Sequence, residues 1–296
     1  MMKSDSMTKS GTQGGVADKS MKASVGNAVI TVILWAGALI MVFPLVYMFL
    51  MSFMTKNQIM SANFSVIPAP WVFGKFSEVM QKGEFISGIF NSVKVAVPVL
   101  IFGGFTSSLA SFAFTKLKFR GKSAIFFVLL SAIMMPFAAV MIPQFVLFST
   151  LGWTNSLLPL IIPGCLGNIG MIFFLIQNDG AVPVSLVEAA KIDGCSYFRT
   201  YWQIFLPLMK GAIATQLILW FMGIWNDYLA PTIFLQDESQ WTLQVVIRSF
   251  NSYYSINSDY ALIMAASVIA MIPTLLMFFF FQRYIIESVA ISGIKG

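Results

Sequence analysis

One segment of the sequence combines charged, small and helix-ending residues at a spacing suited to contact with another protein. Pro183 favours the first turn of a helix, and Gly194 can end that helix in a left-handed conformation. Such a helix is about 16 Å long, too short to cross a hydrocarbon core of about 30 Å. The candidate contact residues are Glu188, Ala189, Ala190, Asp193, Gly194, Leu206 and Pro207.

The chemistry available to this segment is binding. Glu188 offers a carboxylate that an arginine can hold through paired hydrogen bonds, and two alanines allow a second surface to approach closely. We therefore interpret residues 184–194 as a docking helix within a longer docking segment, residues 179–208. Local physics leaves a second interpretation open, which is an ordinary amphipathic helix in a loop.

Residue types used in catalysis are scarce. The chain has no histidine, and its two cysteines, Cys165 and Cys195, lie far apart in the sequence. Imidazole catalysis is therefore excluded, and no cysteine metal or redox pair is expected. The phosphate-binding pattern Gly-x-x-x-x-Gly-Lys-Ser/Thr is absent from the sequence. We expect a protein that is not an enzyme and that binds neither a cofactor nor a metal. Its energy should come from a partner or from an ion gradient.

The composition indicates an all-α integral membrane protein. Hydrophobic residues make up 58% and charged residues 10% of the chain, and the mean hydropathy is +0.82. Soluble domains carry about 25% charged residues. The net charge of +6 is explained by basic loops, so we expect no nucleic-acid partner. The apolar stretches predict six transmembrane helices, at 27–51, 90–114, 124–148, 157–177, 209–232 and 260–282.

The loops predict the orientation. Residues 1–24 are polar and are expected to form a disordered cytoplasmic tail before a transmembrane domain at 25–296. Residues 115–122 hold a cluster of basic residues typical of a cytoplasmic loop. Six spans that start inside place both termini and the docking segment in the cytoplasm, together with most of the 18 Lys and Arg residues. The docking helix would then lie between spans 4 and 5.

Two places are candidates for the translocation path. Pro136 and Pro143 are expected to break the third span, and helix-breaking residues at membrane depth usually line protein or a cavity. Asn226 and Asp227 lie near the outer end of the fifth predicted span. An acid inside a span costs about 2.5–3.5 kcal/mol unless paired or hydrated, so Asp227 belongs either to the path or to an interfacial cap.

The docking segment resembles the signature loop of ABC-importer permeases. The resemblance rests on Glu188-Ala189-Ala190, Gly194, Ile204 and Leu206-Pro207 at fixed spacing. Other elements are similar to the maltose-type branch, which takes up carbohydrates with a binding protein. They are Phe119-Arg120-Gly121, Met264-Ala265-Ala266 and the Gly293-Ile294-Lys295-Gly296 ending.

This resemblance implies a multi-pass permease subunit of the bacterial cytoplasmic membrane, with its family core at about 88–282. It implies that the docking helix is a coupling helix seated in a separate ATPase, which binds the ATP. The implied partners are two cytoplasmic ATPase subunits, a second homologous permease, an extracytoplasmic solute-binding protein and membrane lipid. Sugars or oligosaccharides are the expected cargo. Polyols, glycerol phosphates, polyamines and amino acids stay open, as do an ion-driven secondary transporter and a membrane-embedded enzyme.

Overall fold

The regular elements are all helices within the residues that the computed structural model describes, which are 13–61, 65–251 and 258–293; side chains are described from residue 27 to residue 284 of these ranges. The elements are α1 (Gln13–Met51), α2 (Lys56–Ile59), α3 (Gly74–Gln81), α4 (Gly83–Pro98), η1 (Val99–Gly103), α5 (Gly104–Lys116), α6 (Lys122–Ile133), α7 (Phe137–Thr150), α8 (Leu158–Cys165), α9 (Ile169–Gln177), η2 (Asp179–Ala181), α10 (Val184–Ile192), α11 (Tyr197–Thr200), η3 (Tyr201–Phe205), α12 (Leu206–Trp225), α13 (Leu229–Phe234), η4 (Glu238–Gln240), α14 (Leu243–Ser249) and α15 (Tyr260–Gly293).

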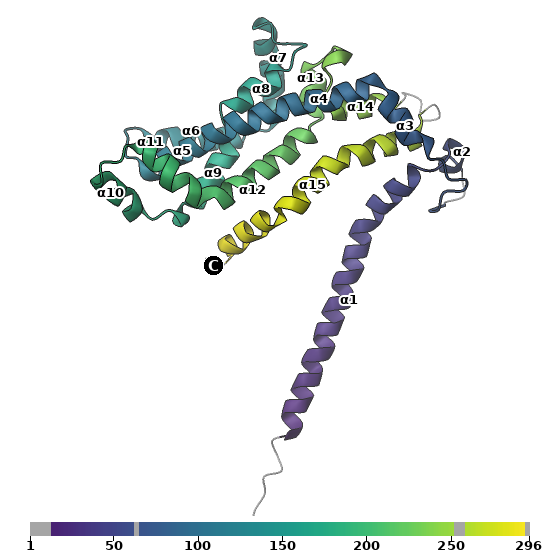
Figure 1. Ribbon diagram of the computed structural model, residues 1–296, viewed down its shortest axis with the longest axis horizontal. Coiled ribbons are helices and arrows are strands. Elements are labelled where there is room, and N and C mark those ends of the chain that lie inside the picture. The colour runs from purple at the N-terminus through teal and green to yellow at the C-terminus, as the bar shows by residue number, and fades with distance from the viewer. Residues whose placement is uncertain (1–12, 62–64, 252–257, 294–296) are drawn as a thin grey trace, which may run out of the picture.

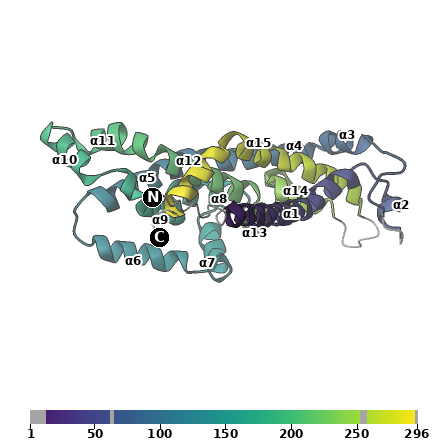
Figure 2. The ribbon, with the colours of Figure 1, turned by 90° about the horizontal axis from the view of Figure 1, so that it is seen from below.

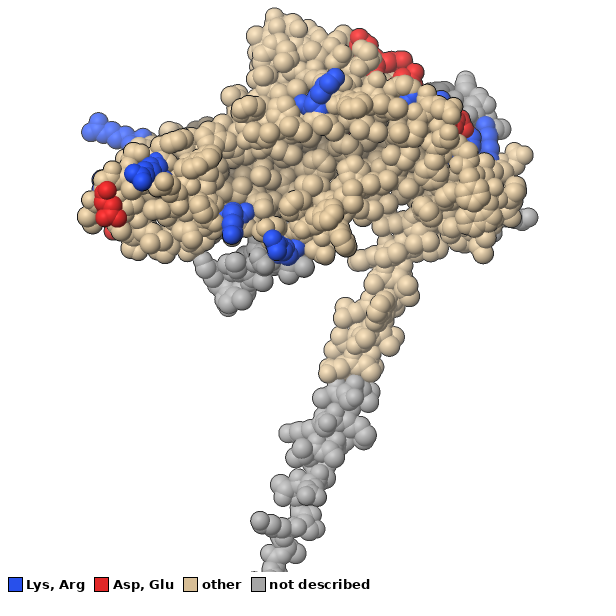
Figure 3. Space-filling view, in the orientation of Figure 1, with Lys and Arg blue, Asp and Glu red and all other residues tan. Residues whose placement is uncertain are grey.

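The main body is an elongated helix bundle, and helix α1 projects away from it (Figure 1). Helices α10 and α11 lie at one end of the body, and α2 and α3 lie at the opposite end (Figures 1 and 2). Most of the visible surface carries no charged side chain, including the described length of α1 (Figure 3). An apolar surface of this extent fits a protein whose solvent is a lipid bilayer.

Within the described residues, five helical stretches are long and apolar enough to cross a membrane. They are Asn27–Met51, Gly83–Lys116, Leu158–Gln177, Tyr197–Trp225 and Tyr260–Tyr284. A sixth crossing requires α6 and α7 together, and these two helices are bent by 100°. The third span, predicted at 124–148 with breaks at its prolines, is therefore interrupted by a sharp bend between α6 and α7.

The bend between α6 and α7 has a local cause. Pro136 adopts an extended backbone with ψ 142°, and a proline disfavours helical geometry in the residue before it. The predicted break at Pro136 is confirmed. The predicted break at Pro143 is wrong, because α7 continues through that residue.

The second span is longer than predicted. It runs from Gly83 to Lys116 through α4, the π-helical η1 and α5, which is roughly 50 Å at the ordinary helical rise. The predicted span at 90–114 covers only part of this helix, and Lys94 lies well inside the helix with its side chain exposed.

Close helix packing around the second span depends on small residues. A Cβ on Gly103 would lie 2.3 Å from the carbonyl oxygen of Gly164, so only glycine fits there. The Ser107 hydroxyl accepts a hydrogen bond from the backbone N–H of Asn168 at 2.8 Å. Small residues in a membrane span allow helices to pack closely, and these contacts show that role.

Two segments between the predicted spans contain helices of their own. Residues 53–86 hold α2 and α3, and residues 233–259 hold η4 and α14. Helix α14 packs against α4, with Leu243 and Val246 buried in a core that also contains Phe85 and Ala266. This end of the molecule is therefore a packed structure and not a set of free loops.

The predicted N-terminal tail falls partly on described residues. Helix α1 begins at Gln13, so residues 13–24, which we expected to be disordered, continue the helix of the first span. Residues 1–12 lie outside the described residues.

Candidate functional site

The docking segment connects α9 to α12 at one end of the body (Figure 1). The structure contains the predicted short helix, α10, whose N-cap is Pro183. We expected the fifth span to start at 209. Instead α11, η3 and α12 form one apolar stretch from Tyr197 to Trp225, so the fifth span starts earlier than predicted.

Helix α10 has a buried side and an exposed side. Val187 and Ala190 are 7% and 5% exposed and face the body. Glu188 and Ala189 are exposed, and the neighbouring Ile192 is 87% exposed. The Glu188 carboxylate makes no ion pair within the described residues, and the exposed isoleucine beside it adds an apolar surface available to a partner.

The C-terminus of α10 is closed by a Schellman motif. The N–H of Gly194 donates to the carbonyl of Lys191 at 3.1 Å, and the N–H of Cys195 donates to the carbonyl of Ala190 at 2.9 Å. Gly194 has φ +77°, and a Cβ there would meet no atom within 4 Å. The glycine is thus required by its backbone conformation. Asp193, just before it, is the exposed C-cap residue.

The entry to the docking segment is fixed to α5 by a buried cation. The Lys116 ammonium lies 2.6 Å from the Asp179 carboxylate, and its side chain is only 1% exposed. The same ammonium donates to the backbone carbonyl of Val182, directly before Pro183. Lys116 therefore joins the end of the second span to the residues that lead into α10.

The exit of the docking segment is fixed to α5 as well. The hydroxyls of Ser108 and Tyr201 share a hydrogen bond of 2.8 Å, and Tyr201 is fully buried. The ring of Tyr201 packs edge-on against Phe112, with centroids 5.6 Å apart. Val187 of α10 belongs to the same buried cluster. Both ends of the docking segment therefore hold on to one helix, α5.

The last two predicted contact residues of the segment lie inside a helix. Leu206 and Pro207 begin α12 directly after the π-helical η3, with Leu206 half-buried and Pro207 exposed. A proline near a helix start loses no hydrogen bond, because the first N–H groups of a helix have no partner. These two residues follow Phe205, which is buried against α5.

The predicted path residues are placed differently from the prediction. Helix α12 ends at Trp225, so Asn226 and Asp227 lie in the break between α12 and α13 and not inside a span. Asp227 accepts a hydrogen bond from the N–H of Ala230 at 3.3 Å, which favours the cap interpretation. Burial raises the pKa of the Asp227 carboxyl, although the N–H groups of Ala230 and Leu229 oppose that effect. Pro143 is exposed on α7.

Sequence reasoning missed the residues that hold the segment in place. Lys116 was grouped with the basic residues of a cytoplasmic loop, and Asp179, Ser108 and Tyr201 were given no role. One signal was available, since Asp179 is the first charge after the long apolar stretch that follows Lys122. An acid at such a boundary favours a basic partner at the same depth.

Comparison with known proteins identifies the family. The model of the family described as "binding-protein-dependent transport system inner membrane component" matches residues 103–291. The chain is 30% identical over 262 residues to the arabinooligosaccharides transport system permease protein AraQ of Halalkalibacterium halodurans, covering 88% of this chain and 93% of that protein. It is 30% identical over 256 residues to the lactose transport system permease protein LacG of Rhizobium radiobacter, covering 86% and 92%.

The fold has a close structural relative. A bacterial ABC transporter involved in the import of the acidic polysaccharide alginate aligns with a TM-score of 0.79 and 22% identity, over 89% of this chain and 97% of that one. A second alginate transporter structure, in complex with an alginate pentasaccharide-bound periplasmic protein, aligns with a TM-score of 0.64 and 17% identity, over 90% and 95%.

The chain belongs to the binding-protein-dependent transport system inner membrane component family. It is a membrane permease subunit of an ATP-driven importer, and members of this family are transport proteins rather than enzymes.

Proposed function

We propose that this permease imports sugars or oligosaccharides and that α10 transmits the movement of a separate, ATP-binding subunit. The cargo class is supported by the relatives, whose names include arabinooligosaccharide and lactose transport. The single observation that carries the coupling role is the geometry of α10. Its exposed side offers Glu188 and Ile192, while its buried side and both of its connections are fixed to the bundle.

The attachments suggest how movement passes into the membrane. When a partner moves α10, the Lys116–Asp179 ion pair pulls at the end of α5, and Tyr201 pulls at Ser108 further along the same helix. Two contacts on one packed helix favour its displacement as a rigid body, which is the ordinary form of such transitions. Alternating access would follow from rocking of this helix against its neighbours.

The proposed partners follow from surfaces that the chain leaves uncovered. No residue in the most apolar stretch of the α1 span is buried in the described structure. Large side chains such as Trp35 and Met41 are exposed along it. Lipid and a second homologous permease are the proposed neighbours of α1. A pair of ATPase subunits would bind at α10 in the cytoplasm, and a solute-binding protein would bind at the opposite end.

Uptake by reconstituted transporter tests this function. Proteoliposomes holding the permease pair and the ATPase are offered labelled arabinotriose or lactose, with ATP inside or with an ionophore. We expect uptake that requires ATP and a binding protein and that persists with the ionophore. Uptake abolished by the ionophore but independent of ATP would identify an ion-driven transporter instead. Uptake of only a polyol or a polyamine would replace the cargo and leave the coupling role intact.

Labelling tests the orientation. Ile192→Cys, in a chain whose two native cysteines are replaced by serine, places a thiol on the most exposed part of α10. We expect an impermeant maleimide to label this thiol in inside-out vesicles and not in intact cells, and ATPase binding to protect it. Labelling in intact cells would reject the cytoplasmic position of the docking segment.

A further inference from the structure

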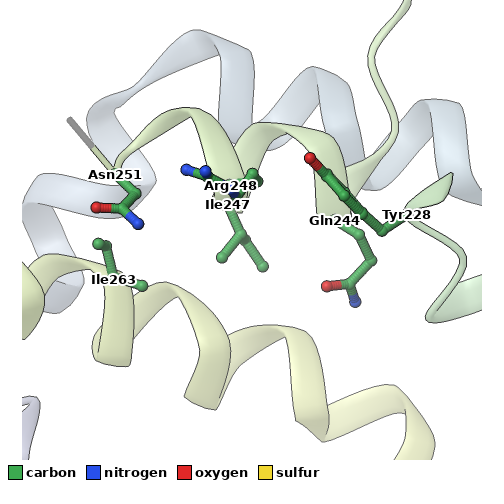
Figure 4. A pocket seen from close by; sticks show the side chains of 6 residues that line it. All are labelled: Tyr228, Gln244, Ile247, Arg248, Asn251 and Ile263. Atoms are coloured by element: carbon green, nitrogen blue, oxygen red, sulfur yellow. The ribbon is translucent and has the colours of Figure 1, made fainter. Parts of the chain in front are cut away.

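A cavity whose lining is mainly apolar, with a few polar groups, lies beside helix α14 (Figure 4). Helix α14 lies away from α10, toward the opposite end of the body (Figure 1). The volume of the cavity is about 250 Å³, smaller than the about 300–1,000 Å³ of sites for drug-sized ligands. It therefore suits one ring of a longer chain. The residues that line this outer cavity are Tyr228, Gln244, Ile247, Arg248, Asn251 and Ile263.

The helix that carries most of this lining is held firmly. The Asn91 side-chain amide donates to the backbone carbonyls of Ser239 and Trp241, and the Ser92 hydroxyl accepts from the N–H of Leu243. Gly88 lets α14 approach α4 closely, since a Cβ there would lie 3.2 Å from the Cα of Leu243. The cavity is therefore formed before any ligand arrives, which lowers the entropic cost of binding.

The polar groups of the outer cavity have spare hydrogen-bonding capacity. Arg248 is exposed, and within the described part of the chain its guanidinium makes no ion pair or hydrogen bond. Gln244 uses its amide nitrogen on the carbonyl of Trp225, which leaves its oxygen available. The Asn251 oxygen accepts from Ser258 at 2.7 Å, which leaves its amide N–H groups available.

The apolar part of the lining complements these groups. Ile247 is buried beneath α14, and Ile263 faces it from α15, while Tyr228 adds a ring that is 41% exposed (Figure 4). A sugar ring presents apolar C–H faces and a polar edge, which matches a ring and two isoleucines beside two amides. The planar guanidinium of Arg248 can bind a carboxylate through two parallel hydrogen bonds, which favours acidic ligands.

We propose that the outer cavity binds an acidic sugar residue, a uronate, with Arg248 holding its carboxylate and Gln244 and Asn251 holding its hydroxyl groups. This inference rests on the proposed saccharide cargo and narrows it to chains that contain carboxylated sugars. The cavity lies at the end of the body where the solute-binding protein is proposed to deliver cargo. Its role is to receive one ring of the incoming chain before the translocation path opens.

Paired ligands that differ only in charge test the proposal. The probes are trigalacturonate and its fully methyl-esterified form, and binding to the purified permease–ATPase complex in nanodiscs is measured by calorimetry. We expect the wild-type complex to bind the acid form at least tenfold more tightly than the ester. Arg248→Gln should weaken binding of the acid form more than binding of the ester and so remove this preference, and Arg248→Lys should restore part of it.

A control variant separates the specific contact from general electrostatics. Lys94→Gln removes another exposed cation, on α4, that does not line the outer cavity, and we expect it to keep the tenfold preference. Equal loss of preference in both variants would overturn the proposal, as would wild-type complex that does not distinguish the two probes. If Arg248→Gln weakens binding of the solute-binding protein and keeps the preference for the acid form, Arg248 contacts that protein and not the sugar.

The same complexes reconstituted into proteoliposomes distinguish this inference from the proposed function. ATP-dependent uptake of the neutral ester, arabinotriose or lactose with no preference for the acid form would uphold saccharide import and reject the uronate subsite. Absence of uptake for every saccharide, in a complex that hydrolyses ATP, would reject the proposed cargo class itself. Tighter binding of the acid form that depends on Arg248 would support both.

Discussion

Two basic side chains, one at each end of this permease, have opposite surroundings. At the docking end, Lys116 is buried and paired with Asp179, and Tyr201 is buried and bonded to Ser108. At the other end, Arg248 is exposed and unpaired within the described residues. A satisfied polar contact transmits displacement, because breaking it leaves a buried group without a partner. A polar side chain without a partner is available to bind a ligand. The buried Lys116 pair is therefore suited to transmit movement, and the exposed Arg248 is suited to bind a ligand.

The largest effect is expected from removing the buried cation. Lys116→Met leaves the partly buried Asp179 carboxylate without its partner, and we expect a loss of about 2–3 kcal/mol of stability, somewhat less than for a fully buried pair. Thermal unfolding of the purified chain in detergent measures it. Arg248→Gln is the matched variant from the other end, and its melting temperature should stay close to wild type.

A double variant sharpens that result. Lys116→Met combined with Asp179→Asn removes the orphaned charge, so part of the lost stability should return. Uptake should stay low in the double variant, because the attachment between α5 and the docking segment is still missing. Full recovery of uptake would show that the ion pair stabilises the fold without transmitting movement.

The next effect comes from the end of α10. Gly194→Val forces a β-branched residue to φ +77°, at a cost of about 1–2 kcal/mol. We expect ATP hydrolysis to persist while uptake falls, because the helix loses its fixed C-terminus. Gly194→Asn is the control, since asparagine tolerates this conformation, and it should transport nearly normally. Equal uptake by both variants would contradict a role for the cap.

A smaller effect is expected from the second attachment to α5. Tyr201→Phe keeps the buried ring and removes one hydroxyl, so about 1 kcal/mol should be lost. The partner is not left orphaned, because the Ser108 hydroxyl also donates to the carbonyl of Phe105 at 2.9 Å. Comparing uptake per ATP hydrolysed in this variant and in Lys116→Met tests whether the two attachments contribute equally.

The smallest effect on stability is expected from lowering the pH, which acts on an ion pair at the outer end. Lys75 bridges Glu78 of α3 and Asp259 at the start of α15, with the Lys75–Asp259 contact at 2.6 Å. Burial of Asp259 acts to raise its pKa, but the hydrogen bond and charge of Lys75 outweigh burial and lower the pKa. The stabilisation is therefore present above about pH 3.9 and is lost as the pH falls below that value.

For this half-buried pair at the surface the loss should be about 1 kcal/mol or less. Melting temperatures measured between pH 6 and about pH 3 should show a smaller drop for Asp259→Asn than for wild type. An identical pH profile for the two proteins would mean that this ion pair contributes nothing measurable.

Local sequence signals predicted the parts of the fold that depend on few residues. The short helix after Pro183, its end at Gly194 and the break at Pro136 follow from backbone preferences that act within a single turn. The close packing at Gly103 was also predictable, since small residues in an apolar span indicate helix contact. The bend of 100° between α6 and α7 was not predicted, because a proline predicts a break and not its angle.

The sequence by itself determined that this chain is a helical membrane protein with a short docking helix, because apolar length and the Pro183–Gly194 spacing are properties of one stretch at a time. Only the tertiary structure decided which charges are paired. Lys116 meets Asp179, and Arg248 stays unpaired beside Gln244 and Asn251, through the packing of helices that are distant in sequence. Burial and pairing are relations between such helices, and they decide which basic residue transmits movement and which is free to bind cargo.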